Sequence, residues 1–128
     1  MQCIATITLV VPDYDEAIAY FVQNLDFQLL EDTPLTPEKR WVRVTPKGSS
    51  GPALLLAKAK NDQEARAIGN QTGGRVAFFL QTDDFQNDYQ AFQQAGVTFV
   101  EEPRQEPYGK VAVFQDIYGN RWDLVEYH

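Results

Sequence analysis

The clearest pattern of hydrophobic and polar positions lies at the end of the chain, in residues 111–127. An apolar run, Val-Ala-Val-Phe, ends at a polar segment over residues 116–120, and a second, largely apolar run follows it. Gly119 and Asn120 accept positive φ angles, and the Asp116 side chain can accept hydrogen bonds from backbone N–H groups two residues on. The pattern therefore predicts a β-hairpin, with Asp123 standing among large side chains in its second strand.

Helical spacing of apolar residues occurs in each half of the chain. In the first half it predicts a helix over residues 14–24, which Asp13 begins as a capping residue with Glu16 three positions later. In the second half Asp84 caps a helix that ends near Gly96. The inward-facing residues are Ala17, Tyr20, Phe21 and Leu25 in the first helix and Tyr89, Phe92 and Ala95 in the second.

Segments with strand-like patterns flank these helices in the same order in both halves. The predicted strands of the first half cover residues 4–11, 27–31, 40–45 and 53–57. Those of the second half cover residues 75–81, 97–101, 110–115 and 121–127, with a proline-rich loop over residues 102–109. Residues 58–74 are mostly polar, contain a short helix predicted near residues 62–68, and are interpreted as a linker.

The two halves are an internal repeat of a βαβββ module. A shift of 71 residues places Asp13 over Asp84 and Phe21 over Phe92, and after the helix a shift of 70 places Glu31 over Glu101. A module of this size buries too little apolar surface to be stable alone, so the two should pack against each other or against those of a partner. We predict one α+β domain over residues 1–128, with module one at about 4–57 and module two at about 75–127.

Composition and charge argue against a nucleic-acid-binding, a membrane-spanning or a secreted protein. The formal net charge is -7, with no basic stripe, which argues against nucleic acid as a partner. No apolar run is long enough to span a membrane, and the N-terminus lacks the pattern of a signal peptide. The single cysteine, Cys3, allows no internal disulfide, so we expect a cytoplasmic location.

The order of these segments resembles the vicinal oxygen chelate superfamily, which includes glyoxalase I, bleomycin-resistance proteins and extradiol dioxygenases. The resemblance covers nearly the whole chain. It is carried by residues 11–13, 17–21 and 25–27 in module one and by residues 83–85, 95–97 and 114–124 in module two. It implies two βαβββ modules whose curved mixed sheets form a cup for a small molecule, and it implies a homodimer.

The resemblance also gives four positions at which metal-dependent members carry metal ligands. These positions correspond to Thr6, Ala53, Ala77 and Asp123 in this chain. A divalent metal usually takes three or four His, Cys or carboxylate ligands from the protein, and this set offers one. We therefore predict no metal and no cofactor, which argues against glyoxalase I and extradiol dioxygenase chemistry, since both need the metal as a Lewis acid.

Asp123 is the candidate catalytic residue, as a general base or as a partner for a cationic ligand group, although a carboxylate paired with arginine or solvated is the alternative. Arg75 could be its counter-ion or could bind a ligand carboxylate, and Arg121 is the other possible partner. The remaining predicted ligand-binding residues are Thr6, Thr8, Phe79 and Tyr108. The sequence thus indicates a metal-free cup that binds a small organic molecule. The alternative is a glyoxalase-like lyase or isomerase acting on a small carbonyl or acid substrate through Asp123.

Overall fold

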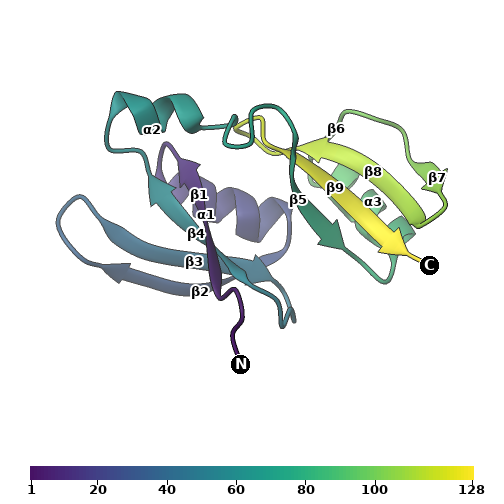
Figure 1. The fold of residues 1–128 in the computed structure, drawn as a ribbon, viewed down its shortest axis with the longest axis horizontal. Helices are drawn as coiled ribbons and strands as arrows, with labels where there is room; N and C mark the ends of the chain where they lie inside the picture. The colour runs from purple at the N-terminus through teal and green to yellow at the C-terminus, as the bar shows by residue number, and fades with distance from the viewer. The chain divides into compact units, whose positions relative to one another are not determined.

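The computed structural model describes all 128 residues, and it divides the chain into two compact units, Met1–Ile68 and Gly69–His128 (Figure 1). The boundary falls inside the polar segment predicted as a linker. The first unit contains a four-stranded sheet and the second a five-stranded sheet, both of mixed direction, and each unit contains the helix that follows its first strand. The predicted α+β fold with two βαβββ modules is therefore confirmed.

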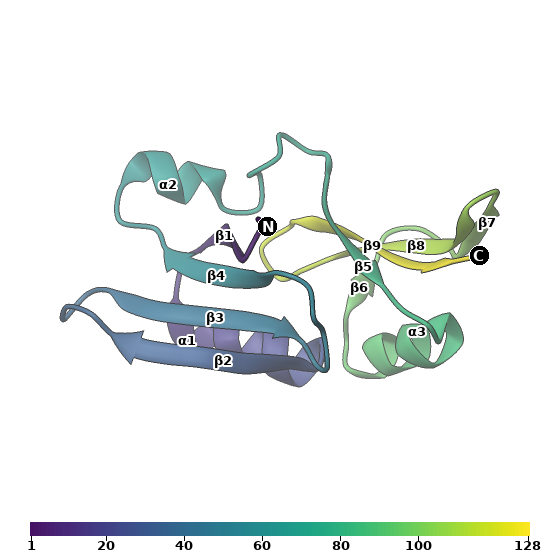
Figure 2. The same cartoon turned by 60° about the horizontal axis from the view of Figure 1, so that its bottom comes forward.

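The first unit forms a sheet in the order β1-β4-β3-β2, with β1 and β4 parallel and the other pairs antiparallel. Figure 2 shows α1 behind this sheet. The elements are β1 (Thr6–Val11), α1 (Tyr14–Ala19), the π-helical turn η1 (Tyr20–Asn24), β2 (Phe27–Pro34), β3 (Arg40–Pro46), β4 (Ala53–Lys58) and α2 (Asp62–Ala67).

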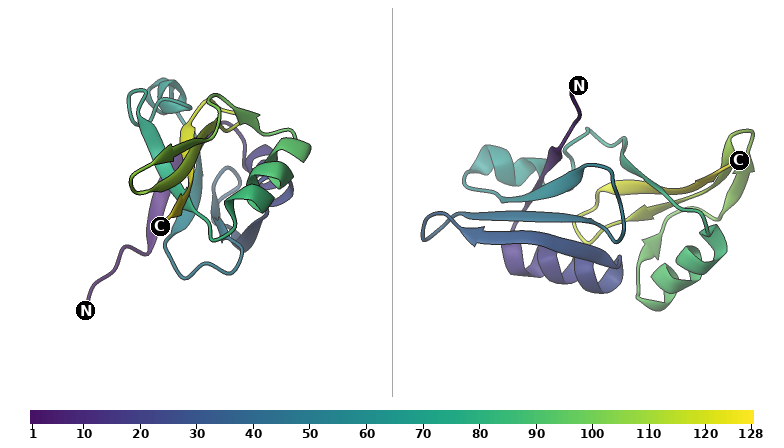
Figure 3. Two further views of the ribbon diagram at one scale, coloured as in Figure 1. Left: turned by 90° about the vertical axis from the view of Figure 1, so that its right-hand side faces the viewer. Right: turned by 90° about the horizontal axis from the view of Figure 1, so that it is seen from below.

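The second unit repeats this order as β5-β9-β8-β6, with β7 also paired to β8. Strands β5 and β9 are parallel, and the other pairs are antiparallel. In Figure 3 helix α3 lies along one face of this sheet. The elements are β5 (Val76–Gln81), α3 (Phe85–Gln94), β6 (Thr98–Phe99), β7 (Arg104–Glu106), β8 (Gly109–Gln115) and β9 (Arg121–Tyr127).

Strand alternation gives each sheet a helix-covered face and a helix-free face. In the first sheet the side chains facing α1 are fully or almost fully buried, and they are Leu9, Val11, Val42, Val44, Leu54 and Leu56. In the second sheet Phe114 faces α3, with its ring 5.4 Å from that of Phe92 and 5.6 Å from that of Trp122. Each unit therefore has its own apolar core between sheet and helix, and its other sheet face is left for other contacts.

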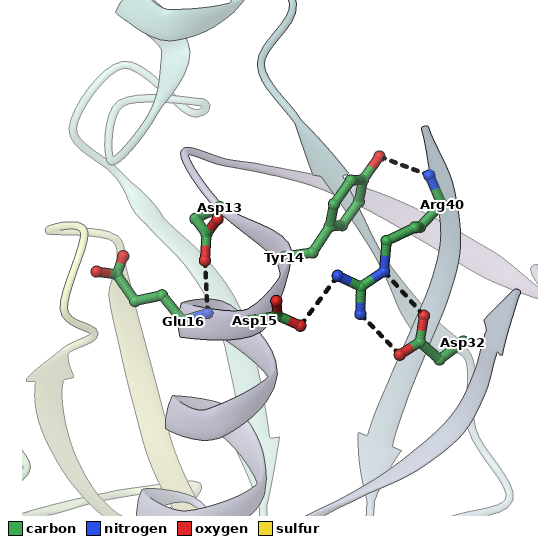
Figure 4. Close-up of polar contacts among 6 residues, drawn as sticks. All are labelled: Asp13, Tyr14, Asp15, Glu16, Asp32 and Arg40. Carbon is green, nitrogen blue, oxygen red and sulfur yellow. Dashed lines mark hydrogen bonds and ion pairs between the residues drawn. The ribbon is translucent and has the colours of Figure 1, made fainter. Parts of the chain in front are cut away.

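Helix α1 is held at its first turn by polar contacts. Asp13 caps it, with Oδ2 accepting from the Glu16 N–H at 2.8 Å, as the sequence predicts. Arg40 on β3 donates to Asp15 at 2.9 Å and, through Nε and Nη2, to both carboxylate oxygens of Asp32 on β2 (Figure 4). The two bonds from Arg40 lower the pKa of Asp32. These contacts fix the helix against one edge of the sheet.

The structure differs from the sequence prediction at three places. The first helix is α-helical only to Ala19 and ends in a π-helical turn before Asp26, the one non-glycine residue with positive φ, at 57°. Strand β6 has two residues in place of the predicted five, because the chain pairs with β8 only at Thr98 and Phe99. The proline-rich loop contains a strand, β7, which pairs with β8.

Candidate functional site

Asp123 lies on the helix-free face of the second sheet, which we define by Phe79, Val113, Arg121 and Asp123. Its backbone partners are Phe79 on β5 and Val113 on β8, while the neighbouring Trp122 points to the helix side. Asp123 is 7% exposed, whereas Phe79 is 65% exposed. A buried carboxylate thus lies directly beside an exposed aromatic ring.

Oδ1 of Asp123 is buried and has no hydrogen-bond partner. Burial raises the pKa of this carboxyl, the nearby charge of Arg104 acts against that rise, and Glu101 adds to it. A buried acceptor without a donor costs free energy, roughly 1–3 kcal/mol. The geometry therefore supplies an acceptor for a donor group that the chain itself does not provide.

Arg104 is the residue near Asp123 that the sequence did not indicate. It lies on β7, with Val111 on β8 as backbone partner, and donates to Glu106 at 2.7 Å and to Glu101 at 2.7 Å. These carboxylates, Glu106 first, raise the pKa of Arg104. The only sequence signal was the polar segment Arg-Gln-Glu between two prolines, which is too short for a strand prediction.

The predicted arginine partners do not pair with Asp123. Arg121 is exposed on the same face, two residues from Asp123, and Arg75 is exposed just before β5 begins. The register between β5 and β9 shifts between Val76 and Phe78, so Ala77 sits in a bulge. This bulge breaks the alternation on which the predicted direction of the Arg75 side chain depended. The role of either arginine in ligand binding stays a prediction.

The other predicted ligand-binding residues lie at different positions in the two units. Tyr108 is 47% exposed and packs beside Tyr127, with ring centroids 6.2 Å apart. Tyr127 is four residues beyond Asp123, which is roughly 13 Å along a strand. Thr6 and Thr8 lie on β1 in the first unit, where they pair with Ala53 and Leu55. The structure thus brings together Asp123, Phe79 and Arg121, and it does not bring Tyr108 to them.

The register also corrects the module-one counterpart of Asp123. Asp123 pairs with Phe79 and with Val113, and the repeat matches these two residues to Thr8 and Arg43. In module one the residue that pairs with both Thr8 and Arg43 is Leu55, so Leu55 is the counterpart of Asp123. Sequence matching placed Ala53 there instead, since it applied one shift across β-turns of different lengths and did not foresee the bulge in β5. Leu55, like Ala53, has no metal-binding atom.

The positions that carry metal ligands in metal-dependent relatives hold few metal-binding atoms in either unit. In the first unit Thr6 and Ala53 are backbone partners, and a neutral threonine hydroxyl is the only side-chain donor between them. In the second unit Ala77 has none, so Asp123 is alone. No group of three or more His, Cys, Asp or Glu side chains in the chain could hold a metal ion. The residues present therefore do not fit a divalent metal at these positions.

A hollow of about 470 Å³ lies elsewhere in the second unit, between α3 and the segment around β6. It is lined by Tyr89, Gln93, Val97, Phe99, Val100, Glu101 and Glu102. Asp123 is not part of its lining. This hollow is therefore distinct from the helix-free face, although Glu101 lines it and also binds Arg104.

The sequence profile of the glyoxalase/bleomycin resistance protein/dioxygenase superfamily matches residues 4–124. The chain belongs to this superfamily. An uncharacterized protein of Shewanella frigidimarina is 53% identical over 126 residues, covering 98% of this chain and 93% of that protein. The superfamily's two βαβββ modules are those observed here.

Two solved structures of similar fold span almost the whole chain. UcmS2 is 30% identical, covers 98% of both chains and has a TM-score of 0.85. TnmS3, described as an antibiotic binding protein from Streptomyces sp. CB03234, is 27% identical, covers 100% of this chain and 98% of its own, and has a TM-score of 0.79.

The helices of this chain are too short or too polar to span a membrane.

Proposed function

We propose that this protein binds a small organic molecule on the helix-free face of the second sheet, without a divalent metal. The observation that carries the proposal is the buried, unpartnered Oδ1 of Asp123 beside the exposed ring of Phe79. A ligand with a flat apolar part would cover Phe79, and an N–H or O–H group on it would satisfy Asp123. Similarity to TnmS3 supports an antibiotic-like compound as the ligand.

A thermal-shift screen of metabolites and antibiotics, run with and without divalent metals, tests this proposal. A ligand at about 100 times its Kd stabilises the native state by about 2.7 kcal/mol, which should raise Tm by roughly 10 °C. We expect hits that do not need metal and that lose most of their shift in Asp123→Asn. Asp62→Asn, at an exposed acidic residue on α2, is the matched control and should keep the shift.

Two results would overturn the proposal. One is a screen in which no organic compound raises Tm. The other is stoichiometric zinc, nickel, manganese or iron in the purified protein, together with hits that all disappear when the metal is removed.

A second candidate function is catalysis, with Asp123 as a general base on a small carbonyl or acid substrate. The raised pKa of this carboxyl favours it, because a base works best with a pKa nearer to neutral pH. Compounds found in the screen would be incubated with the protein and followed by proton NMR. Turnover that Asp123→Asn abolishes supports the enzyme, and binding without turnover supports sequestration.

We also propose that the protein is a homodimer that does not bind nucleic acid. The charge of -7 would repel a phosphate backbone. The dimer is supported by the small size of each unit and by the exposed apolar residues Ile7 and Leu29, which an association could cover.

A further inference from the structure

Arg43 is the charged residue at the centre of the helix-free face of the first sheet. It lies on β3, with Glu31 on β2 and Leu55 on β4 as its backbone partners. Its Nη1 donates to Glu31 in an ion pair, and its side chain is 22% exposed. Thr8 follows next across the sheet, as the partner of Leu55. Arg43 therefore lies between one carboxylate, on Glu31, and one apolar side chain, Leu55.

Two polar atoms on this face have no partner. Nε of Arg43 and Oγ1 of Thr45 are both buried without a hydrogen bond, and Thr45 as a whole is 4% exposed. The two residues are two positions apart on one strand, so their side chains leave the same face about 7 Å apart. A guanidinium group donates only, and a threonine hydroxyl can donate as well. Both atoms can therefore donate to acceptors that a ligand brings to this face.

Trp41 completes this arrangement. It precedes Arg43 by two positions on β3, shares its face, and is 37% exposed. An indole at the edge of such a site offers a surface for stacking on a planar ring. The repeat supplies an internal comparison, because the module-two counterpart of Arg43 is Val113. The arginine is thus not required by the fold of the sheet, since the second sheet forms with a valine there.

We propose that Trp41, Arg43 and Thr45 bind a carbonyl or carboxylate oxygen of a planar aromatic ligand, with Arg43 as the main donor. The inference extends the proposed function, on which it rests only for the premise that the protein binds a small organic molecule. A guanidinium group suits this role because its fixed donors match such oxygens. Glu31 stays paired and holds the guanidinium in place.

The test uses two probes with the same ring, 2-naphthoate and 2-naphthylmethylammonium, titrated into ¹⁵N-labelled protein. The first probe carries only acceptors and the second only donors. We expect 2-naphthoate to shift the Arg43 Nε–H and Trp41 indole signals in a saturable way and to bind at least tenfold more tightly than the ammonium compound. In Arg43→Met this preference should disappear, and in Arg43→Lys it should fall.

Arg40→Met is the matched control, because Arg40 lies on the same strand but is held by Asp15 and Asp32 on the other side. It should keep the preference for 2-naphthoate. If Arg43→Met does not fold, Arg43→Lys keeps both charge and length and decides the test. The inference is overturned if 2-naphthoate leaves the Arg43 and Trp41 signals unmoved, or if both Arg43 variants bind the two probes as the wild type does.

The failure of this inference is distinguishable from the failure of the proposed function. Screen hits that depend on Asp123, together with 2-naphthoate binding that is unchanged in both Arg43 variants, would leave the proposed function standing and remove the inference. Binding of 2-naphthoate that depends on Arg43, with no hit that depends on Asp123, would support the inference and remove the proposed site at Asp123.

Discussion

At the scale of single residues, Asp123 should make stability depend on pH. Its pKa in the folded protein is raised above the value in the unfolded chain, so the unfolded state holds the charge more easily. The cost of this buried charge is full above the folded pKa and vanishes below the unfolded value of about 3.8. Removing the charge should therefore stabilise the protein at neutral pH.

Urea unfolding of the wild type and Asp123→Asn between pH 4 and pH 7 measures this effect. We expect the variant to be more stable at pH 7 and the difference to shrink as pH falls toward 4. A difference that is constant over this range, or that favours the wild type at pH 7, would show that Asp123 is not an ionised, destabilising group in the unliganded protein.

Asp26 is the second residue with a specific energetic prediction. Its φ of 57° is costly for a side chain with a Cβ atom, and its one ion pair, to Lys47 at 3.3 Å, is exposed. Asp26→Gly should therefore stabilise the protein by about 0.5–1 kcal/mol. Asp26→Ala should destabilise it, because alanine gains no local hydrogen bond in this conformation. Thermal unfolding of both variants checks the prediction, and equal effects of Gly and Ala would contradict it.

At the scale of elements, the turn between β8 and β9 depends on Asp116. Its Oδ1 accepts from the backbone N–H groups of Tyr118 and Asn120 at 3.0 Å each. Its Oδ2 accepts from the Asn120 side chain at 2.9 Å and from the Trp122 indole at 3.1 Å. One carboxylate therefore joins the turn to the core through Trp122.

Asp116→Ala should destabilise the protein by about 3 kcal/mol or more, because it leaves several buried donors without an acceptor. The control is Thr36→Ala in the exposed turn between β2 and β3, where Thr36 Oγ1 accepts from Lys39 N–H at 3.0 Å. That change should cost about 1 kcal/mol or less, since water replaces the lost bond. Urea denaturation would contradict the argument if the two variants lost equal stability.

The elements that the sequence predicted well are those whose signals are local. The hairpin at the C-terminus, the capping residues Asp13 and Asp84 and the order of both modules follow from turn chemistry and side-chain periodicity, and the structure contains them. The missed features depend on pairing between distant segments. Strand β7 and the bulge at Ala77 are set by register against β8 and β9, which no local pattern records.

The candidate site was predicted only in part for the same reason. Asp123 could be found because a carboxylate among large apolar residues is conspicuous in sequence, and the structure places it in a buried position. Arg104 could not be found, since its proximity to Asp123 depends on β7 folding back onto β8. Arg43 lacked any signal, because an arginine in a strand is ordinary until its unpartnered Nε is seen.

At the scale of the whole molecule, the small size of the two units and their exposed apolar residues favour association between chains. Units of this size, Met1–Ile68 and Gly69–His128, bury too little apolar surface for independent stability. The exposed side chains of Ile7 and Leu29 add unfavourable apolar surface if they stay in water. Association between two chains would remove that surface.

We therefore expect a mass of twice 14.5 kDa in size-exclusion chromatography with light scattering at micromolar concentration. Leu29→Ser should weaken the dimer, because it removes an exposed apolar side chain that association would cover, whereas Asp62→Asn, at an exposed position on α2, should leave the mass unchanged. The Tm of a dimer also rises with protein concentration, because association favours the folded state by mass action. A single-chain mass at tens of micromolar, with a Tm independent of concentration, would contradict the dimer.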